Sequence, residues 1–264
     1  MKPVFTYNGK YGTLNYHQAG PEYCTFQQTI AYPDNILIDY ALENHFTING
    51  KEIQEGYFQI SKANGKSRNI QALNERTWTF LTISVVTKSV KKLRLPVKPA
   101  NGKINLAAIR ILLRLLYSRK SSALLDDWME AVINLLLYES LESKSPNQPG
   151  QQLLWHDAVL VHGAVETLKN RRGPLFLDTR LEEKTGLKRY RFQKACRQLY
   201  GLSLKEMIYR KKMEETLQMV TLSDQSLKEI SRLAGFNNYD NFITAFRNYY
   251  DITPALLRRA TFNR

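Results

Sequence analysis

Along the first ninety residues, apolar and polar positions alternate with a period of two. Ile36, Ile38 and Tyr40 are separated by single residues, and an Asn-Gly pair at 49–50 interrupts a second alternating run. Alternation of this kind is typical of half-buried strands in an antiparallel sheet or barrel. Because Asn-Gly readily adopts the positive φ angles of a two-residue hairpin, the pair marks a turn. The pattern predicts a β-rich region over residues 1–90.

Past Pro99 the spacing of apolar residues changes to three and four, which is the period of an α-helix. Two segments, Ile104–Tyr117 and Ala123–Leu141, show this spacing, and both carry more apolar residues than a solvated surface helix needs. We expect them to pack on the sheet, on each other or on a second copy of the chain. An intramolecular core and a homodimer through residues 104–141 are therefore both open.

Residues 143–152 contain prolines, serines, amides and a glycine, without an apolar run. This composition predicts a linker. It would separate a regulatory domain over residues 1–142, helical from 100 to 142, from an all-helical domain over residues 153–264. The chain is therefore expected to be an α+β protein of two domains.

The C-terminal region contains an internal repeat. Phe192, Ala195, Arg197 and Tyr200 recur fifty residues later as Phe242, Ala245, Arg247 and Tyr250. Each copy reads as a short helix, a turn opened by a glycine and a longer second helix, and a long helix over residues 203–220 joins the copies. This is the layout of two helix-turn-helix units. The competing interpretation is a pair of helical hairpins in an ordinary bundle.

The second helix of a helix-turn-helix unit needs an apolar face that anchors it and a polar face that enters the major groove of DNA. In the first copy the anchor is Phe192, Ala195, Cys196 and Leu199, and the outward residues are Tyr190, Gln193, Lys194 and Arg197. In the second copy the anchor is Phe242, Ala245, Phe246 and Tyr249, and the outward residues are Tyr239, Asp240, Ile243, Thr244 and Arg247. Both copies therefore have the face that DNA recognition requires.

Residues from about 155 to 260 resemble the DNA-binding domain of AraC/XylS-type transcription regulators. The residues that carry the resemblance are Gly186-Leu187 in the first unit, and Ile230-Ser-Arg-Leu-Ala-Gly-Phe236, Phe242, Phe246-Arg247, Tyr249-Tyr250 and Thr253-Pro254 in the second. The resemblance implies an all-α domain with two helix-turn-helix units joined by a long helix. It also implies a sequence-specific regulator that binds double-stranded DNA and works with RNA polymerase, and we expect an activator.

The candidate DNA-binding residues are the outward positions and their basic or capping neighbours: Lys188, Arg189, Tyr190, Arg191, Gln193, Lys194, Arg197, Asn238, Tyr239, Asp240, Ile243, Thr244 and Arg247. Asp240 and Ile243 are poor partners for phosphates and for most base edges. We therefore expect the first unit to carry most of the sequence selectivity.

In the AraC/XylS family a cupin-like β-barrel, followed by dimerisation-type helices, usually precedes the DNA-binding domain. Residues 36–85 are similar to that pattern, which implies a cupin-like barrel at the N-terminal end of this chain. Such a barrel encloses a cavity that could hold a small-molecule effector. It could instead bind a partner protein or serve only as a dimerisation scaffold, so the means of control is open.

The chain has 38 Lys and Arg against 24 Asp and Glu, a net charge of +14, which favours a polyanionic partner. No uncharged stretch reaches the ~20 apolar residues of a membrane-spanning helix. The N-terminus lacks the apolar core of a signal peptide. The two cysteines, Cys24 and Cys196, are far apart in the sequence and fit a reducing compartment. A cytoplasmic protein without a membrane partner is expected.

Catalytic chemistry is not expected from this sequence. His17 and His45 are not clustered as a cupin metal site requires, and His156 and His162, six residues apart, fall on different sides of a helix. No glycine-rich phosphate loop or nucleophile elbow occurs. A cupin-type metalloenzyme is the weakest alternative, and no catalytic residue, metal or cofactor is predicted.

Overall fold

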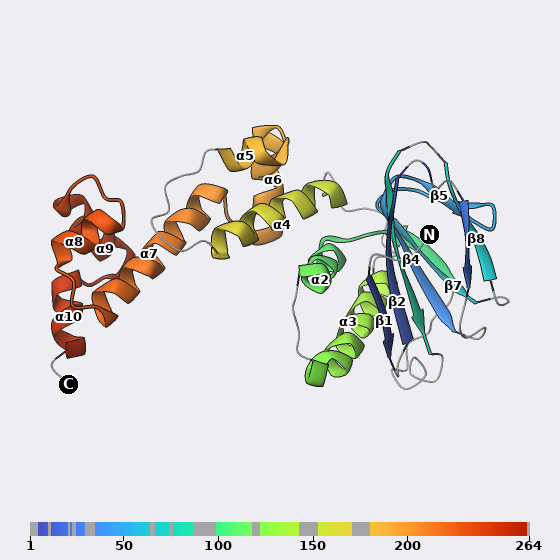
Figure 1. Ribbon diagram of the computed structural model, residues 1–264, viewed down its shortest axis with the longest axis horizontal. Helices are drawn as coiled ribbons and strands as arrows, with labels where there is room; N and C mark the ends of the chain where they lie inside the picture. Colours follow the sequence, from blue (N-terminus) through green and yellow to red (C-terminus); the bar gives the residue numbers. More distant parts are fainter. Residues whose placement is uncertain are drawn as a thin grey trace. The chain divides into compact units, whose positions relative to one another are not determined.

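The computed structural model describes residues 5–9, 12–20, 22, 25–29, 35–63, 67–73, 76–86, 99–117, 122–142, 153–170 and 180–262. The chain divides into two compact units, residues 1–159 and 160–264, and the division falls inside helix α4 (Trp155–Asn170). The first unit combines strands and helices, and the second is helical (Figure 1). The predicted linker over residues 143–152 lies outside the described residues and stays a prediction.

The strands of the first unit form two antiparallel sheets. The larger sheet has the order β1 (Phe5–Gly9), β2 (Gly12–Ala19), β9 (Trp78–Val85), β4 (Ile36–Glu43), β7 (Tyr57–Lys62) and β10 (Ala100–Lys103). The smaller sheet has the order β3 (Thr25–Thr29), β8 (Ser67–Ala72), β5 (Phe46–Ile48) and β6 (Lys51–Ile53). The predicted turn at Asn49-Gly50 joins β5 to β6, and both residues have positive φ angles, 49° and 80°.

The expected cupin-like barrel is not confirmed, although the β-rich antiparallel domain is. In the described part of the chain, the edge strands β1 and β10 of the larger sheet do not pair with the smaller sheet, so the strands do not close into a barrel. The period-two pattern explains why the sequence does not distinguish a closed barrel from two open sheets. It places one face of each strand in a core, and both an open pair of sheets and a closed barrel satisfy it.

The central strands β4 and β9 are buried on both faces, rather than on one as their alternation predicts. Tyr40 points to the helical side of the larger sheet, because its hydroxyl lies 3.1 Å from the carbonyl oxygen of Leu136 and 2.7 Å from Oγ of Ser140. Its neighbour Asp39 points the other way, toward Arg68 of the smaller sheet. The helices therefore cover one face of the larger sheet, and the smaller sheet covers the other face.

An apolar core fills one part of the space between the two sheets. Its buried members are Ala19, Ala41, Phe46, Ile48, Ile53, Ile70, Trp78 and Phe80. His17 belongs to this layer, since its ring stacks on Phe80 with centroids 4.5 Å apart. The side chain of His17 is 4% exposed, and neither ring nitrogen has a hydrogen-bond partner. Burial in this apolar environment, with a smaller contribution from Arg68, lowers the pKa of His17 to about 4.

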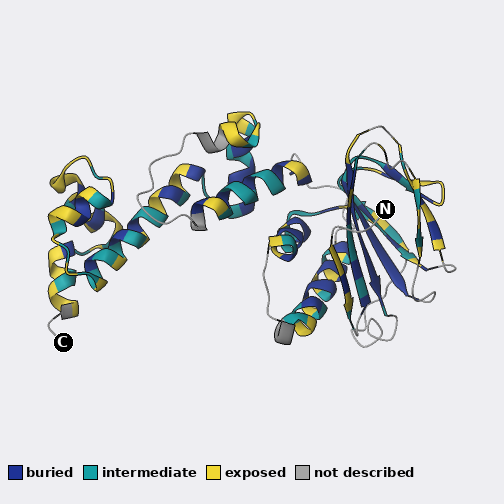
Figure 2. Cartoon of the chain, in the orientation of Figure 1, coloured by how far each residue is buried: buried dark blue, intermediate teal, exposed yellow. Residues whose placement is uncertain are grey.

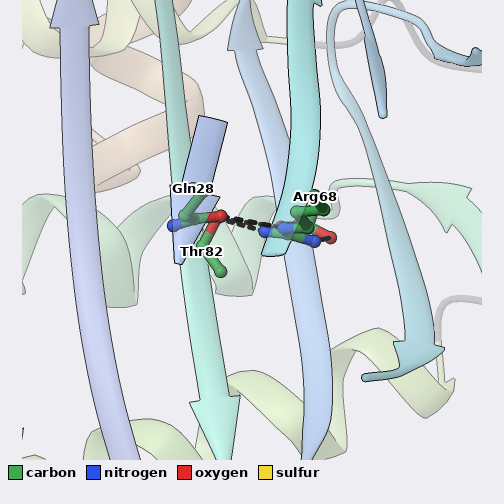
Figure 3. A network of polar contacts seen from close by, with 4 residues as sticks. Gln28, Arg68 and Thr82 are labelled. Atoms are coloured by element: carbon green, nitrogen blue, oxygen red, sulfur yellow. Dashed lines mark hydrogen bonds and ion pairs between the residues drawn. The ribbon is translucent and has the colours of Figure 1, made fainter. Parts of the chain in front are cut away.

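A polar network also lies between the two sheets (Figure 3). Arg68 donates to both carboxylate oxygens of Asp39, at 2.6 and 2.5 Å, and to Oγ1 of Thr82 at 2.9 Å. Its Nε donates to Gln28 at 2.8 Å. Arg68 is 4% exposed and Asp39 is fully buried, so the bidentate pair neutralises two charges inside the core.

The two predicted helices of the first unit are α2 (Leu106–Tyr117) and α3 (Ser122–Glu142). In Figure 1 they lie beside the larger sheet. Figure 2 shows buried positions along α3. Its buried side chains include Met129, Val132, Ile133, Leu136 and Leu137. Val132 therefore belongs to the intramolecular core and cannot form part of a dimer seam.

Among its described residues, the second unit contains seven helical segments that include the C-terminal part of α4. The others are α5 (Arg180–Thr185), α6 (Arg189–Tyr200), α7 (Leu204–Leu222), α8 (Leu227–Leu233), α9 (Tyr239–Tyr250) and α10 (Pro254–Phe262). The long joining helix begins where the sequence predicts, because Ser203 caps α7 and forms a capping box with Glu206. Among the described helices, none is long and apolar enough to cross a membrane.

Candidate nucleic-acid interface

The first helix-turn-helix unit is formed by α5 and α6. Gly186 lies in the turn between them with φ +67°, a conformation that strongly favours glycine. Lys188 is the N-cap residue of α6, and no side chain caps the helix there. Gly201 ends the helix with φ 74°, and its N–H donates to the carbonyl oxygen of Arg197. The sequence thus fixes both ends of a twelve-residue helix whose N-terminal amides are not taken by a capping side chain.

The two faces of α6 are as the sequence predicts. The anchor residues Phe192, Ala195, Cys196 and Leu199 are all buried. Tyr190 is 67% exposed. It lines an open hollow of about 380 Å³ together with Gln193, Lys194, Arg197 and Gln198. The structure therefore brings four predicted site residues together on one surface.

Gln198 is a residue of this surface that the sequence analysis missed. It lies one helical turn after Lys194, and both side chains line the same hollow. At about 100° per residue, Gln198 falls next to Lys194 on the helix circumference. The helical period alone is enough to place Gln198 on this face.

Basic side chains surround the beginning of α6. Lys188 and Arg189 are exposed, and Arg191 is half-buried. Lys188 is the N-cap, and Arg189 and Arg191 lie in the first turn, where the positive end of the helix dipole attracts anions. This end of α6 is therefore suited to a phosphate group.

The second unit is formed by α8 and α9 with a turn at Gly235, where φ is +67°. Ser226 caps α8 by accepting a hydrogen bond from the backbone N–H of Glu229 at 3.2 Å. Asn238 caps α9 in the same way, with its Oδ1 2.7 Å from the N atom of Asn241. The Asn238 side chain is thus used as a helix cap.

Two assignments on α9 need correction. Ile243, predicted to point outward, is half-buried and packs on the core of Met213, Val220, Ile230, Phe242 and Phe246. Tyr249, predicted as an anchor, is 37% exposed and meets Tyr209 edge-on with centroids 5.8 Å apart. Its place in the anchor is taken by Tyr250, whose ring lies 4.8 Å from that of Phe246. The outward set on α9 is therefore Tyr239, Asp240, Thr244 and Arg247, all exposed.

Helix α7 fixes the second unit through Lys212. Its Nζ lies 3.5 Å from the ring centroid of Phe236 and donates to the carbonyl oxygen of Gly235 at 3.0 Å. Partial burial lowers the pKa of Lys212 below its usual range. A side chain of the joining helix thus holds the turn that precedes the recognition helix α9.

The histidines of α4 have separate partners. Nδ1 of His156 lies 3.2 Å from Oε1 of Glu43, and Nδ1 of His162 lies 2.5 Å from the hydroxyl of Tyr200. Within the described residues, no group of three or more His, Cys, Asp or Glu side chains could hold a metal ion. The second contact links α4 to the C-terminal end of α6.

The first unit has an open hollow of about 720 Å³ at one end of the larger sheet. It is lined by Gln18, Glu43, Asn44, Glu55, Arg76, Thr77 and His156. Carboxylates and cationic or titratable groups thus face the same space.

Residues 181–260 match the model of a protein family described as a helix-turn-helix domain. The chain is 26% identical over 99 residues to the multiple antibiotic resistance protein MarA of Escherichia coli, a match that covers 37% of this chain and 77% of MarA. It is 24% identical over 94 residues to the probable transcription factor PqrA of Proteus vulgaris, covering 36% of this chain and 76% of PqrA. Among solved structures, ToxT of Vibrio cholerae with a bound unsaturated fatty acid aligns with 98% of this chain and 99% of its own, at 12% identity and a TM-score of 0.37.

Proposed function

We propose that this chain is a DNA-binding transcription regulator of the AraC/XylS type, and that α6 reads the base sequence of its operator. The match of residues 181–260 to a helix-turn-helix family model and the similarity to MarA support this proposal. The observation that carries the proposal is the hollow that Tyr190, Gln193, Lys194 and Arg197 line together. Tyr190 and Arg197 are exposed there, and Gln193 and Lys194 are half-buried. These residues stand on a helix whose opposite face is buried. The helix can therefore enter a major groove without losing its anchor.

The side chains of α6 suit different parts of the DNA. The amide of Gln193 can pair bidentately with an adenine, and Lys194 can reach the O6 and N7 edge of a guanine. Tyr190 supplies an aromatic ring and a hydroxyl near the start of the helix. Arg197 lies a turn further along, where a phosphate contact is expected, and Lys188, Arg189 and Arg191 are placed for phosphates at the helix N-terminus.

The second unit is proposed to position the protein on the DNA through phosphate contacts more than to select the base sequence. Asn238 caps its own helix, and Ile243 packs inward, so neither is free to read a base. Tyr239, Asp240 and Thr244 remain on the outer face with Arg247. A carboxylate such as Asp240 can accept from a base-edge donor such as a cytosine N4–H but repels phosphates, whereas Arg247 attracts any phosphate.

Control is proposed to act through a small effector in the hollow that Glu43, Glu55 and Arg76 line. His156 lines the same hollow from the first turn of α4, so a bound molecule would contact the helix that continues into the second unit. A thermal-shift screen of small zwitterions tests this. We expect a stabilised wild-type chain and no shift for the Arg76→Ala and Glu55→Gln variants; equal shifts in all three would place the effector elsewhere.

We further propose that the regulator acts in the cytoplasm as an activator that contacts RNA polymerase. A homodimer through residues 104–141 stays a prediction, and it would need side chains other than Val132. The experiment that tests the function is binding-site selection from random duplex DNA with the full-length chain. We expect one enriched motif with two major-groove segments. Recovery of unrelated sequences would defeat the proposal of base readout.

A further inference from the structure

The outward face of α3 is apolar although it is exposed. Leu135 is 50% exposed and Tyr138 is 49% exposed, and Ala131 between Trp128 and Leu135 is exposed as well. These residues lie on the side of the helix opposite the buried Ile133. Exposed and buried positions can be followed along α3 in Figure 2. The helix therefore buries one apolar face in the core and presents a second one to solvent.

The second apolar face has the spacing of a helix-packing seam. Trp128, Ala131, Leu135 and Tyr138 are separated by three, four and three residues; Trp128 is half-buried and the other three are exposed. A three-four spacing forms a narrow stripe that packs against another α-helix. We call these four residues the α3 stripe. Its geometry indicates a helical partner, rather than a strand or an extended peptide.

The charge of α3 indicates what kind of helix would bind. Its sequence contains five carboxylates, Asp126, Asp127, Glu130, Glu139 and Glu142, and no Lys, Arg or His. Asp127 and Glu142 are exposed near the two ends of the α3 stripe. A second α3 packed against this one would bring like charges together, which opposes self-pairing. A helix with Lys or Arg beside its apolar seam would instead be complementary.

We propose that the α3 stripe docks a basic amphipathic helix of a partner protein. Helix α3 is held by its buried face, where the carbonyl oxygen of Leu136 and Oγ of Ser140 bond to Tyr40, so the stripe is presented on a fixed support. The partner would contact the regulatory unit and not the DNA-binding surface. The competing occupant is a second copy of the chain, because the neighbouring helix α2 exposes Arg110 and Arg114.

The test uses the full-length protein without DNA and a fluorescent three-heptad peptide with leucines at three-four spacing and lysines beside them. Fluorescence anisotropy is expected to give a micromolar dissociation constant. Replacing the peptide lysines with glutamates should weaken binding by about tenfold or more, and so should the double change Leu135→Ser and Tyr138→Ser in the protein. Both side chains are half-exposed, and an unchanged thermal midpoint would show that the variant folds.

Leu256→Ser on α10 is the matched control, because Leu256 is 55% exposed but lies on the other unit. It should leave peptide affinity unchanged. Equal affinity for the lysine and glutamate peptides would overturn the proposal, as would an unchanged affinity in the double variant. If sedimentation shows that the wild type is a dimer and the double variant is a monomer, the occupant of the α3 stripe is a second copy of the chain. None of these results depends on whether α6 reads DNA.

Discussion

At the scale of single residues, Gln193 and Arg197 are expected to respond differently to substitution although they share one surface of α6. Gln193→Ala should cost about 1–3 kcal/mol on the cognate site and relax selectivity at one base position. Arg197→Ala should weaken binding to all sequences alike, because a phosphate carries no sequence information. Binding-site selection with each variant measures both effects. If Gln193→Ala weakens every sequence equally while Thr244→Ala relaxes selectivity, the roles of the two units are reversed.

His17 predicts a pH dependence of stability. Its pKa is about 4 in the folded chain against about 6.5 when exposed, so between these values the unfolded chain binds the proton and the folded chain does not. Stability is therefore complete above pH 6.5 and falls as the pH drops toward 4, by up to about 3 kcal/mol.

Replacing His17 with Phe should keep the stacking on Phe80 and remove this pH dependence. Urea unfolding at pH 7 and pH 4.5 measures the difference. The control is His45→Asn, because the His45 side chain is 44% exposed and contacts Glu52 at the surface. If the stability of His17→Phe still falls between pH 7 and pH 4.5 as it does in the wild type, another group causes the pH dependence.

The Arg68–Asp39 pair is expected to contribute much less to the free energy of unfolding than the loss of either residue alone suggests. Arg68→Met should destabilise the first unit by about 3–5 kcal/mol, since it leaves a buried carboxylate without its counter-charge. The double change Arg68→Met and Asp39→Leu should recover much of that loss. Urea unfolding of the three variants tests this, and a double variant as unstable as the single one would contradict it.

Residue identities on α6 could be predicted from the sequence because one period explains them all: the buried residues recur every three or four positions. On α9 the same reasoning failed at Ile243 and Tyr249. An isoleucine at the border of the apolar face can pack inward, and the exposed tyrosine gains a ring contact with Tyr209 instead. Such border positions are decided by neighbouring helices, which the local sequence does not specify.

At the scale of elements, α7 is expected to act as a rigid spacer. Lys211 donates to the carbonyl oxygen of Leu168 on α4, and the adjacent Lys212 holds the turn of the second helix-turn-helix unit. Two residues inserted between them should rotate one set of contacts against the other by about 200°. The footprint should then shorten to one major-groove segment, and affinity should fall by at least tenfold.

A seven-residue insertion at the same place is the control for α7, because it completes about two turns and nearly restores the original facing. Footprinting and affinity measurements compare the two insertions. Equal footprints from the wild type and the two-residue variant would show that α7 does not set the spacing.

More of the order of the elements along the chain than of the strand pairing could be predicted from the sequence. The hairpin at Asn49-Gly50 and the capped start of α7 both follow from local chemistry, and both are present. Pairing of β2 with β9, and burial of β9 on both faces, depends on residues that are distant in the sequence, from Ala19 opposite Trp78 to Gly12 opposite Val85. Local periodicity carries no information about such partners, so the sequence could not distinguish two sheets from a barrel.

At the scale of the whole molecule, the net charge of +14 is expected to appear as a strong salt dependence of DNA binding. Neutralising six or more phosphates releases their counterions, which predicts a slope of about −5 or steeper for log affinity against log salt. The triple variant Lys188→Ala, Arg189→Ala and Arg197→Ala should reduce the magnitude of that slope by about 2 to 3, because each lost contact removes about 0.9. Lys51→Ala, an exposed change on β6, should leave the slope unaltered. A diffuse attraction would respond equally to the removal of any lysine. If Lys51→Ala lowers the magnitude of the slope as much as each substitution on α6 does, overall charge and not the surface of α6 drives the binding.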